Sequence, residues 1–190
     1  MFQPVSAEHP EQMRHVCLSG NICPRYRKNL KGLRVTGKAQ LYGEHSRLIK
    51  EETGEIQFTE NSLSGICVFN LSLFAKQNDK IVLDLLPDYS ENELIKIIRQ
   101  HISLFCDLPC EQLLTGIFQK RIGQAILKIS RVDLSKICSK LSKDEVSGIC
   151  KTIKSMSFTV SGKEDFSHAQ CALGGVLGKE IDENTMMSKI

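Results

Sequence analysis

Two short loops carry the residues of this sequence that are best suited to holding a ligand. Adjacent glycines let backbone amides approach a flat ring or a phosphate, because no Cβ stands between them. The residues alone also fit two tight structural turns, and they favour that simpler reading. The candidate binding residues in these loops are Thr59, Ser64, Gly65, Gly174, Gly175 and Val176.

Other catalytic chemistry has weaker support in the sequence. There is no glycine-rich dinucleotide or phosphate loop, and no nucleophile elbow. Cys106 and Cys110 lie four residues apart, but Pro109 interrupts that spacing and no fourth ligand is evident, so we expect no metal site. His168 and Cys171 are near neighbours, yet a core thiol beside a surface histidine explains them as well. The catalytic residues therefore remain unknown at this stage.

The charge balance does not select a partner. Twenty-five basic and 22 acidic side chains give a net charge of +3. One basic cluster could contact RNA phosphates, since such contacts need only positive charge, but its proline and asparagine indicate a solvated loop. We do not expect nucleic acid to be the partner. The cluster consists of Arg25, Arg27, Lys28, Lys31 and Arg34.

Cysteine usage and hydropathy suggest a cytoplasmic protein. The eight cysteines are scattered, which predicts free thiols rather than a disulfide framework. No apolar run approaches the length of a membrane span, and the first residues lack the features of a secretion signal. We therefore expect no membrane partner.

The elements that would position the loops begin with strands. Period-two alternation predicts a strand over residues 33–41. Residues 44–50 are expected to form a strand or turn, residues 51–54 a tight turn, and residues 55–58 a short strand. Residues 59–65 are expected to form a loop. Residues 66–75 could be a helix or a buried strand, and residues 80–86 are predicted to be a strand.

Helical periodicity replaces alternation in the middle of the chain. Ser90 with Glu93, and Ser142 with Glu145, have the spacing of capping boxes that begin helices. Further helices are expected through residues 113–118 and 122–129. Residues 157–161 then read as a strand that turns at Gly162.

The order of strands, helices and strands predicts an α+β fold, a small β-barrel interrupted by an inserted helical subdomain. We divide the chain into an arm or linker (residues 1–29), a barrel module (residues 30–89 and 155–190) and a helical subdomain (residues 90–154).

Several motifs, taken together and in order, resemble the aminoacetone-oxidase-like flavoproteins, described as predicted NAD(P)/FAD-dependent oxidoreductases. The resemblance covers about residues 30–190. It rests on the pattern T-G-E-x-x-F-T-x-x-x-L-S-G, on L-K-G-L-R-V before it, on D-L-L-P-D before a helix, on L-L-T-G, and on G-G-V near the end of the chain. These motifs stand at residues 53–65, 30–35, 84–88, 113–116 and 174–176.

The resemblance implies that this chain is the insert of an FAD-dependent oxidoreductase that exchanges hydride with small organic substrates. In such an enzyme the two loops would face the flavin, and a flavin-binding domain, in the same or a separate chain, would be the partner. The glycine-rich FAD fingerprint is missing here, so we expect the isolated chain to be inactive and not to hold FAD tightly. The alternative is a non-enzymatic β-barrel module that binds RNA or protein.

Overall fold

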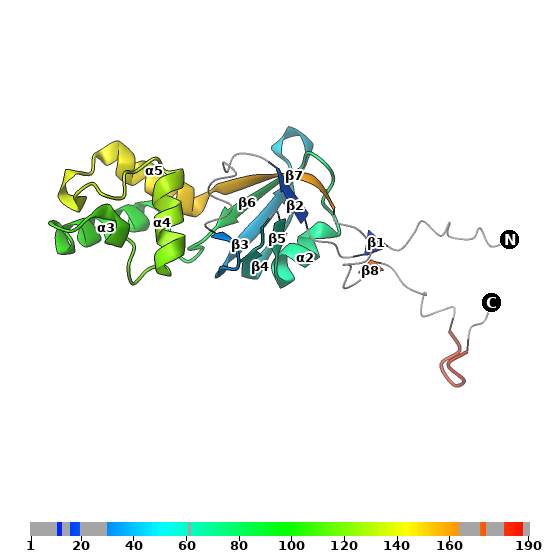
Figure 1. Cartoon of the computed structure of the whole chain (residues 1–190). Helices are drawn as coiled ribbons and strands as arrows, with labels where there is room; N and C mark the ends of the chain where they lie inside the picture. Colours follow the sequence, from blue (N-terminus) through cyan, green and yellow to red (C-terminus); the bar gives the residue numbers. More distant parts are fainter. Residues whose placement is uncertain are drawn as a thin grey trace.

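The structure is a computed structural model of the 190-residue chain that describes residues 11–12, 16–19, 30–60, 62–163, 172–173 and 181–187. Six antiparallel strands are hydrogen-bonded in the order β2-β5-β4-β3-β6-β7, and β7 pairs again with β2, which closes a barrel (Figure 1). The α+β class predicted from the sequence is confirmed. The strands are β2 (Val16–Ser19), β3 (Arg34–Tyr42), β4 (Leu48–Phe58), β5 (Ser62–Ser64), β6 (Lys80–Asp84) and β7 (Met156–Lys163).

In the longest strand pair, β3 with β4, hydrophobic alternation predicted the first strand correctly but not the second. Burial alternates along β3, as the sequence predicts, with Ala39 and Leu41 fully buried. The tight turn expected at residues 51–54 is wrong, because β4 runs unbroken through it and Gly54 pairs with Gly37. The two acidic side chains that suggested a turn both have partners within the fold. Glu51 contacts Lys38 of β3 at 3.4 Å, and Glu52 contacts Lys50 of β4 at 3.0 Å and accepts a hydrogen bond from Asn70 of α2.

Two further short segments differ from expectation. Residues 59–65 are not all loop, since β5 pairs with β4 through Gln57 and Ser64 and with β2 through Leu63 and Val16. Its two serines, Ser62 and Ser64, are buried, so their polarity gave a misleading signal. Helix α2 (Ile66–Ser72) settles the open choice for residues 66–75 in favour of a helix.

The range assigned to an arm or linker contains a barrel strand. Strand β2 lies within residues 1–29 and supplies the pairing between β5 and β7. A strand of four residues is too short for alternation to stand out from its polar surroundings. Upstream of it, β1 (Glu11–Gln12) pairs with β8 (Ala172–Leu173).

The helices lie between β6 and β7 in the chain. They are α3 (Glu91–Leu104), α4 (Lys120–Ile129) and α5 (Lys143–Lys154). Both predicted capping boxes are present, at the starts of α3 and α5. The helix expected at residues 113–118 is wrong. A 3-10 turn (Cys110–Gln112) and successive turns stand there, and Gly116 has a φ of +88°, which ends any helical run.

Two strand ends also differ from the sequence prediction. Strand β6 stops at Asp84, because the amide of Leu85 donates to the carbonyl of Ile153 on α5 instead of continuing the ladder. Strand β7 starts two residues after α5 and continues through Gly162, where a turn was expected. A backbone hydrogen bond from Leu85 to Ile153 thus joins α5 to the barrel, in addition to side-chain contacts.

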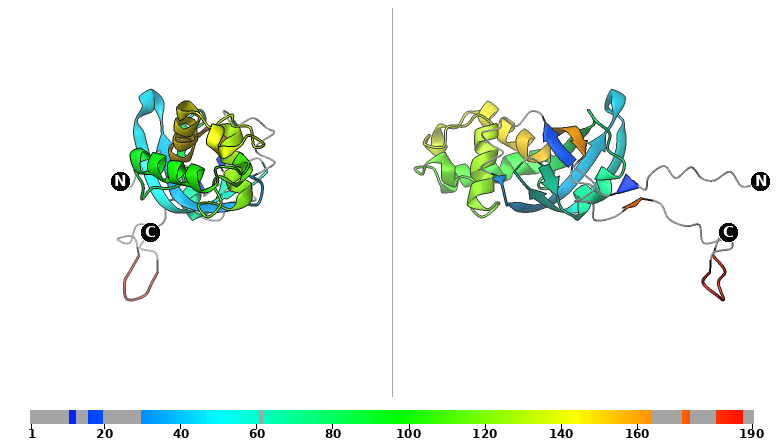
Figure 2. Two further views of the ribbon diagram at one scale, coloured as in Figure 1. Left: turned by 90° about the vertical axis from the view of Figure 1, so that its left-hand side faces the viewer. Right: turned by 45° about the vertical axis from the view of Figure 1, so that its right-hand side comes forward.

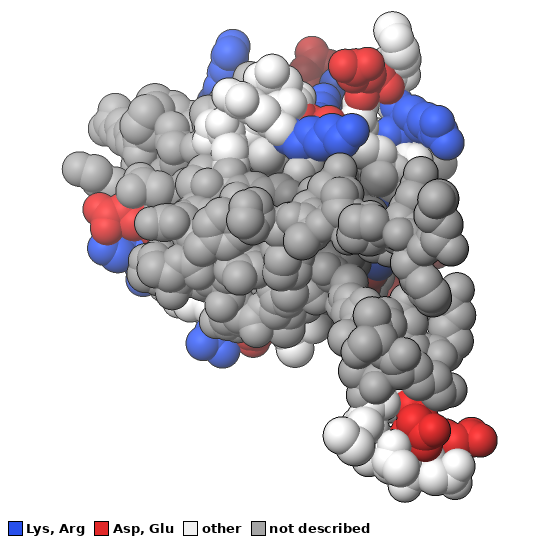
Figure 3. All heavy atoms as spheres, turned by 90° about the vertical axis from the view of Figure 1, so that its right-hand side faces the viewer, with Lys and Arg blue, Asp and Glu red and all other residues white. Residues whose placement is uncertain are grey.

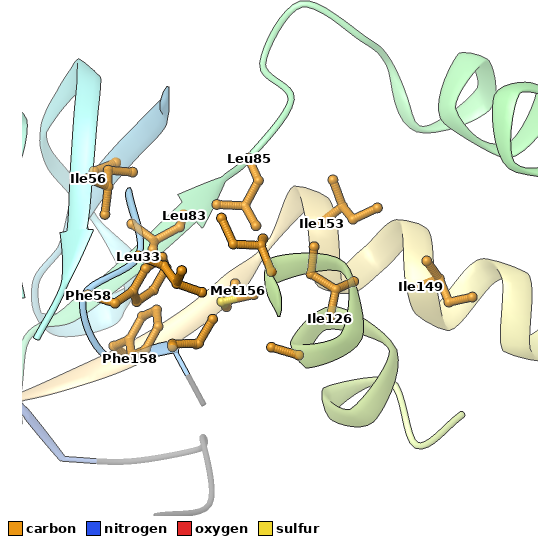
Figure 4. Packing of buried hydrophobic residues seen from close by; sticks show 14 of the residues in the cluster. Leu33, Ile56, Phe58, Leu83, Leu85, Ile126, Ile149, Ile153, Met156 and Phe158 are labelled. Carbon is orange, nitrogen blue, oxygen red and sulfur yellow. The ribbon is translucent and has the colours of Figure 1, made fainter. Parts of the chain in front are cut away.

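One hydrophobic core extends through the barrel and the helices. Figure 4 shows Phe58, Phe158 and Met156 of the barrel facing Ile126 and Ile153 of the helices. Figure 2 shows the helices gathered at one end of the barrel. No helix among the described residues is both long and apolar enough to cross a membrane.

A half-buried lysine holds the two parts together at their junction. The Nζ atom of Lys154, at the end of α5, lies 2.6 Å from the Asp84 carboxylate. It also donates to the carbonyl oxygens of Leu86 and Tyr89, at 2.9 and 2.6 Å. The side chains of Lys154 and Asp84 are only 19% and 15% exposed, so each needs the other to compensate for lost hydration.

Candidate functional site

The barrel has a second end, which lies away from the three long helices (Figure 1). Helix α2 and the tip of the β3–β4 hairpin lie on this side, as does the β1–β8 pair (Figure 1). A 3-10 turn, Glu44–Ser46, forms the tip of the hairpin. The loop that follows α2 leads into β6 and faces this hairpin tip.

A hollow of about 700 Å³ lies between the hairpin tip and the loop that leads into β6. Residues 43–45, 47–49 and 76–79 line it. A second hollow of about 410 Å³ adjoins it and shares Gly43, His45 and Asn78 with it. Together they form one continuous concave feature at the hairpin tip. The sequence analysis did not find it, because it is made by two polar loops far apart in the chain.

Backbone hydrogen bonds hold both loops in place. The amide of Gly43 donates to the carbonyl of Arg47 at 3.0 Å, which closes the hairpin tip. The amide of Asn78 donates to Val160 of β7 at 2.8 Å, and the amide of Val160 donates back to Asp79. The Oδ2 atom of Asp79 accepts the backbone N–H of Lys76 at 2.8 Å. The walls of the hollow are therefore attached to the sheet.

Some cations of the barrel are paired and others are not. Lys38 and Lys50 are both in ion pairs with a carboxylate of β4, whereas Lys80 of β6 is in no ion pair with a described residue. Arg47 and Lys76, at the hollow, are in no ion pair with any residue that the structure describes. Figure 3 shows charged side chains gathered at the top of this face of the molecule.

Apolar side chains are exposed on the same end of the barrel. Leu48 and Ile49, which line the hollow, are 44% and 43% exposed, and Phe74 is 38% exposed. Ile66, the first residue of α2, is 73% exposed. Of these four side chains only Leu48 and Ile49 line the hollow, and single exposed hydrophobic residues are normal on protein surfaces.

The predicted residues of the first loop have structural partners of their own. The Oγ1 atom of Thr59 lies 2.6 Å from the Ser62 hydroxyl and accepts the Ser62 amide. Ser64 is buried in β5. Gly65 has a φ of +103°, and a Cβ there would stand 2.3 Å from the carbonyl oxygen of Glu55. Glycine is required at that position because the backbone of β4 crosses it closely.

Several other sequence candidates lie outside the described residues. They include the second loop (Gly174, Gly175 and Val176), the pair His168 and Cys171, and Arg25, Arg27 and Lys28 of the basic cluster. The two described members of that cluster, Lys31 and Arg34, form ion pairs with Glu60 and Glu55.

Four cysteines are buried packing residues: Cys67, Cys110, Cys138 and Cys150. These four and the half-exposed Cys106 are free thiols, as expected. Burial raises the pKa of Cys67 to about 11, that of Cys110 to about 12 and that of Cys150 to about 11. Such thiols stay protonated at neutral pH and react slowly. Within the described part of the chain, no group of histidine, cysteine or acidic residues is placed to hold a metal ion.

Comparison with known protein families decides the relationship. Residues 23–171 match the model of the HI0933-like protein barrel and H2TH domain. The chain belongs to the HI0933-like family. The match covers the barrel strands from β3 to β7 and all three long helices, and it relates this region to the flavoprotein oxidoreductases.

Two curated relatives of this HI0933-like chain are enzymes. A 3-dehydro-bile acid delta(4,6)-reductase of Clostridium scindens is 28% identical over 165 residues, which cover 83% of this chain and 40% of the reductase. A ribosomal RNA dihydrouridine synthase of Haemophilus influenzae is 24% identical over 137 residues, which cover 70% of this chain and 32% of the synthase. The chain thus spans less than half of the length of either relative.

Proposed function

We propose that this chain is the substrate-side region of a flavin-dependent reductase that reduces a carbon–carbon double bond conjugated with a carbonyl group. The observation that carries the proposal is the chemistry shared by the two relatives. Their substrates differ greatly in size, so common ancestry would conserve the reaction type rather than the substrate. The hydride for such a reduction is supplied by a flavin.

The names of the relatives describe equivalent bonds. A 3-dehydro bile acid with double bonds at positions 4 and 6 is an unsaturated ketone in which the alkenes are conjugated with the 3-oxo group. Dihydrouridine is uridine whose ring double bond, conjugated with a carbonyl, has been reduced. Both reactions add a hydride and a proton across an electron-poor alkene. Oxidation of a small organic substrate, which the aminoacetone-oxidase-like resemblance also allows, is the alternative within the same flavin chemistry.

The partner in this proposal is a flavin-binding region, in the same chain or a separate one. The exposed series of Ile66, Phe74, Leu48 and Ile49 supports a contact on the end of the barrel away from the long helices. The hydroxyl group of Thr59 is engaged with Ser62, and Gly65 is packed against β4, so neither offers a free polar group to a cofactor. We propose that Thr59, Ser64 and Gly65 shape this surface through the backbone.

The second loop keeps the role that the resemblance implies. In the proposal, Gly174, Gly175 and Val176 border the flavin ring in the assembled enzyme, with their backbone rather than their side chains. The small-molecule substrate then lies between the flavin and the barrel. No described residue is assigned as a general acid or base.

A chimera tests the proposal directly. The matching part of the Clostridium scindens reductase is replaced by residues 16–173 of this chain, which include β2 and β8. We expect the chimera to keep its flavin absorbance and to reduce an unsaturated 3-oxo steroid. A flavin-loaded chimera that oxidises a small organic substrate and leaves the alkene intact would favour the alternative. A flavin-loaded chimera without either activity would refute the proposal.

A second candidate function is recognition of RNA, because one relative is a ribosomal RNA dihydrouridine synthase. In this alternative the chain is a binding module and the cluster around Lys31 and Arg34 contacts phosphates. The measurement is fluorescence anisotropy with a ribosomal RNA fragment at several salt concentrations. Affinity that falls steeply with salt would support the alternative, whereas no binding at low salt would exclude it.

A further inference from the structure

We infer that the outer face of helix α2 docks onto an uncharged, apolar surface of the flavin-binding region. The inference rests on the proposed function, because it names the element through which the two regions of that enzyme meet. Its experiment measures the burial of one side chain, so it gives an answer whether or not the enzyme reduces an alkene.

Helix α2 lies in the longest uncharged stretch of the chain. No aspartate, glutamate, lysine or arginine stands between Glu60 and Lys76, although 25% of all residues are charged. A surface helix normally carries charged residues on the face that points away from the core, and a helix that is apolar all round is normally buried. The sequence of α2 is therefore typical of a helix that is covered on both sides.

The inner face of α2 is covered by the barrel. Cys67, Val68 and Leu71 are at most 2% exposed. The thiol of Cys67 also donates to the carbonyl oxygen of Glu55 on β4 at 3.1 Å. This face therefore accounts for the apolar residues on one side of the helix only.

The outer face of α2 is apolar as well. Ile66, Phe69 and Leu73 are three and four residues apart, so they share one side of the helix. Ile66 is 73% exposed, and Phe69 and Leu73 are half-buried. Phe74 extends the same surface and is 38% exposed. These residues form a continuous apolar stripe rather than single exposed side chains.

The position of α2 in the molecule indicates which surface covers the stripe. Strands β1 and β8 stand on either side of residues 23–171, the part matched by the family model, and they pair with each other at the end of the barrel where α2 lies (Figure 1). The curated relatives are more than twice as long as the part they share with this chain. In such longer proteins the sequence on both sides of the match continues from the barrel beside α2.

Charge argues against a lipid surface as the occupant of the stripe. The neighbouring strand β4 carries Glu51, Glu52 and Glu55, and Asn70 of α2 donates to Glu52 at 3.2 Å. Helices that lie on membranes have basic residues on their polar face, which α2 lacks, and these carboxylates would repel anionic headgroups. An apolar protein surface needs no charged partner, which suits the uncharged stripe.

Maleimide labelling of Ile66→Cys tests the inference. In the isolated 190-residue chain we expect rapid labelling. In the flavin-loaded chimera described above we expect labelling that is about tenfold slower or more, because the docked region would shield the thiol. Peptide mapping by mass spectrometry identifies the labelled residue, and the neighbouring Cys67, which is 2% exposed, should stay unlabelled in both proteins.

Leu104→Cys is the matched control. Leu104 is 74% exposed, like Ile66, but it is the last residue of α3, which lies away from α2 (Figure 1). This cysteine should be labelled equally fast in the isolated chain and in the chimera. The ratio of the two labelling rates at Ile66→Cys, divided by the ratio at Leu104→Cys, then measures the shielding of α2 alone.

A charge at the same position gives a second measurement. Ile66→Glu should leave the unfolding midpoint of the isolated chain unchanged and lower that of the chimera by several degrees, since docking would bury an unpaired carboxylate. Leu104→Glu should change neither midpoint. If the chimera does not bind flavin, a graft of residues 62–75 alone into the Clostridium scindens reductase replaces it for the Ile66 variants.

Three results would overturn the inference. The first is equal labelling of Ile66→Cys in the isolated chain and in the flavin-loaded protein. The second is slow labelling in an isolated chain that light scattering shows to be a dimer, because the stripe would then belong to a second copy. The third is slow labelling in a monomeric isolated chain, because the chain would then cover the stripe itself.

The labelling result is distinguishable from the outcome for the proposed function. A chimera that reduces the alkene but labels Ile66→Cys as fast as the isolated chain would refute the docking of α2 alone. A flavin-loaded chimera that shields Ile66→Cys but reduces nothing would refute the reductase proposal alone.

Discussion

The two ends of the barrel differ in how far their apolar and charged side chains are covered. At the end that meets α4 and α5, Leu85 and Met156 are buried against the helices, and Lys154 neutralises Asp84 at the seam. At the other end, Ile66 and Leu48 remain exposed, and the cations at the hollow have no described partner. The first end stabilises the fold, and the second carries the surface that we propose to contact the flavin-binding region.

This difference separates residues that maintain the structure from residues available for function. A change at the helix end should alter the free energy of unfolding and leave recognition unaffected. A change at the open end should do the reverse. The following predictions, in order of decreasing effect, test that separation.

The largest effect is expected from Lys154→Ala. The substitution removes three contacts and leaves the nearly buried carboxylate of Asp84 without its cation. We expect the free energy of unfolding to fall by about 3 kcal/mol. Urea denaturation measures this, with Arg47→Ala at the open end as the control. A loss in the control as large as that in Lys154→Ala would break the comparison between the ends.

Gly65→Ala should lower the free energy of unfolding by about 2 kcal/mol, because it combines a positive φ with a clash against β4. Gly148→Ala is its counterpart in the interior of α5, where nothing lies within 4 Å of a new Cβ. That variant should stabilise the protein by about 0.5–1 kcal/mol, since alanine favours the helix. Thermal or urea unfolding of both variants measures whether the free energy of unfolding falls in Gly65→Ala and rises in Gly148→Ala. A neutral Gly65→Ala would show that α2 can move away from the barrel.

Loss of a helix cap should have a smaller effect. Ser142→Ala removes the side-chain acceptor for the amide of Glu145 and should cost about 1 kcal/mol. Ser147→Ala, at an exposed position inside the same helix, should cost nothing, because alanine is the better helix former. Equal destabilisation of the two variants would mean that the cap contributes no stability.

A pH effect follows from the same capping box. Hydrogen bonds from Lys136 and from the Ser142 amide lower the pKa of Glu145 in the folded protein. Since the folded pKa lies below the unfolded value, the carboxylate stabilises the fold above about pH 4.3 and loses that contribution as the pH falls through the folded pKa. Glu145→Gln should therefore flatten the acid limb of the stability curve measured by urea titration. An unchanged limb would contradict this.

The last prediction is that the absorbance spectrum of FAD does not change in the presence of the chain. Mixing the purified chain with FAD should leave the flavin absorbance spectrum unchanged, because in the proposed function a separate flavin-binding region holds the cofactor. The flavin-loaded chimera provides the positive control for the spectrum. Tight stoichiometric binding by the chain alone would show that this region holds the flavin by itself.

Periodicity and capping predicted those parts of the fold in which each residue has a regular environment. The alternation in β3 and the capping boxes at Ser90 and Ser142 are confirmed. The errors have a common cause, since β5 hides buried serines, β4 carries exposed acids in a strand, and β2 has only four residues. In each case the pairing partner, rather than the local sequence, determines the structure.

The candidate site was less accessible to sequence reasoning than the fold. The hollow lies between the turn around His45 and the loop around Asn78. Both residues have a positive φ, and neither is a glycine, so the sequence did not mark these turns. Arg47 and Lys76 at the hollow form no ion pair with a described residue, whereas Lys38 and Lys50 do. The sequence does not show which lysines and arginines are paired. The sequence analysis instead predicted Thr59 and Gly65 as binding residues, because threonine and glycine are common in ligand-binding loops.

Closure of the barrel by β2 also sets the order in which the chain folds. Val16 pairs with Lys163, so the last ladder joins segments from near opposite ends of the chain, whereas the helices need only local contacts. Contacts between distant residues form slowly, and until β2 arrives the edges of β5 and β7 stay unpaired. A shortened protein that begins at Leu30 should keep its helices, fold incompletely and aggregate through those two edges.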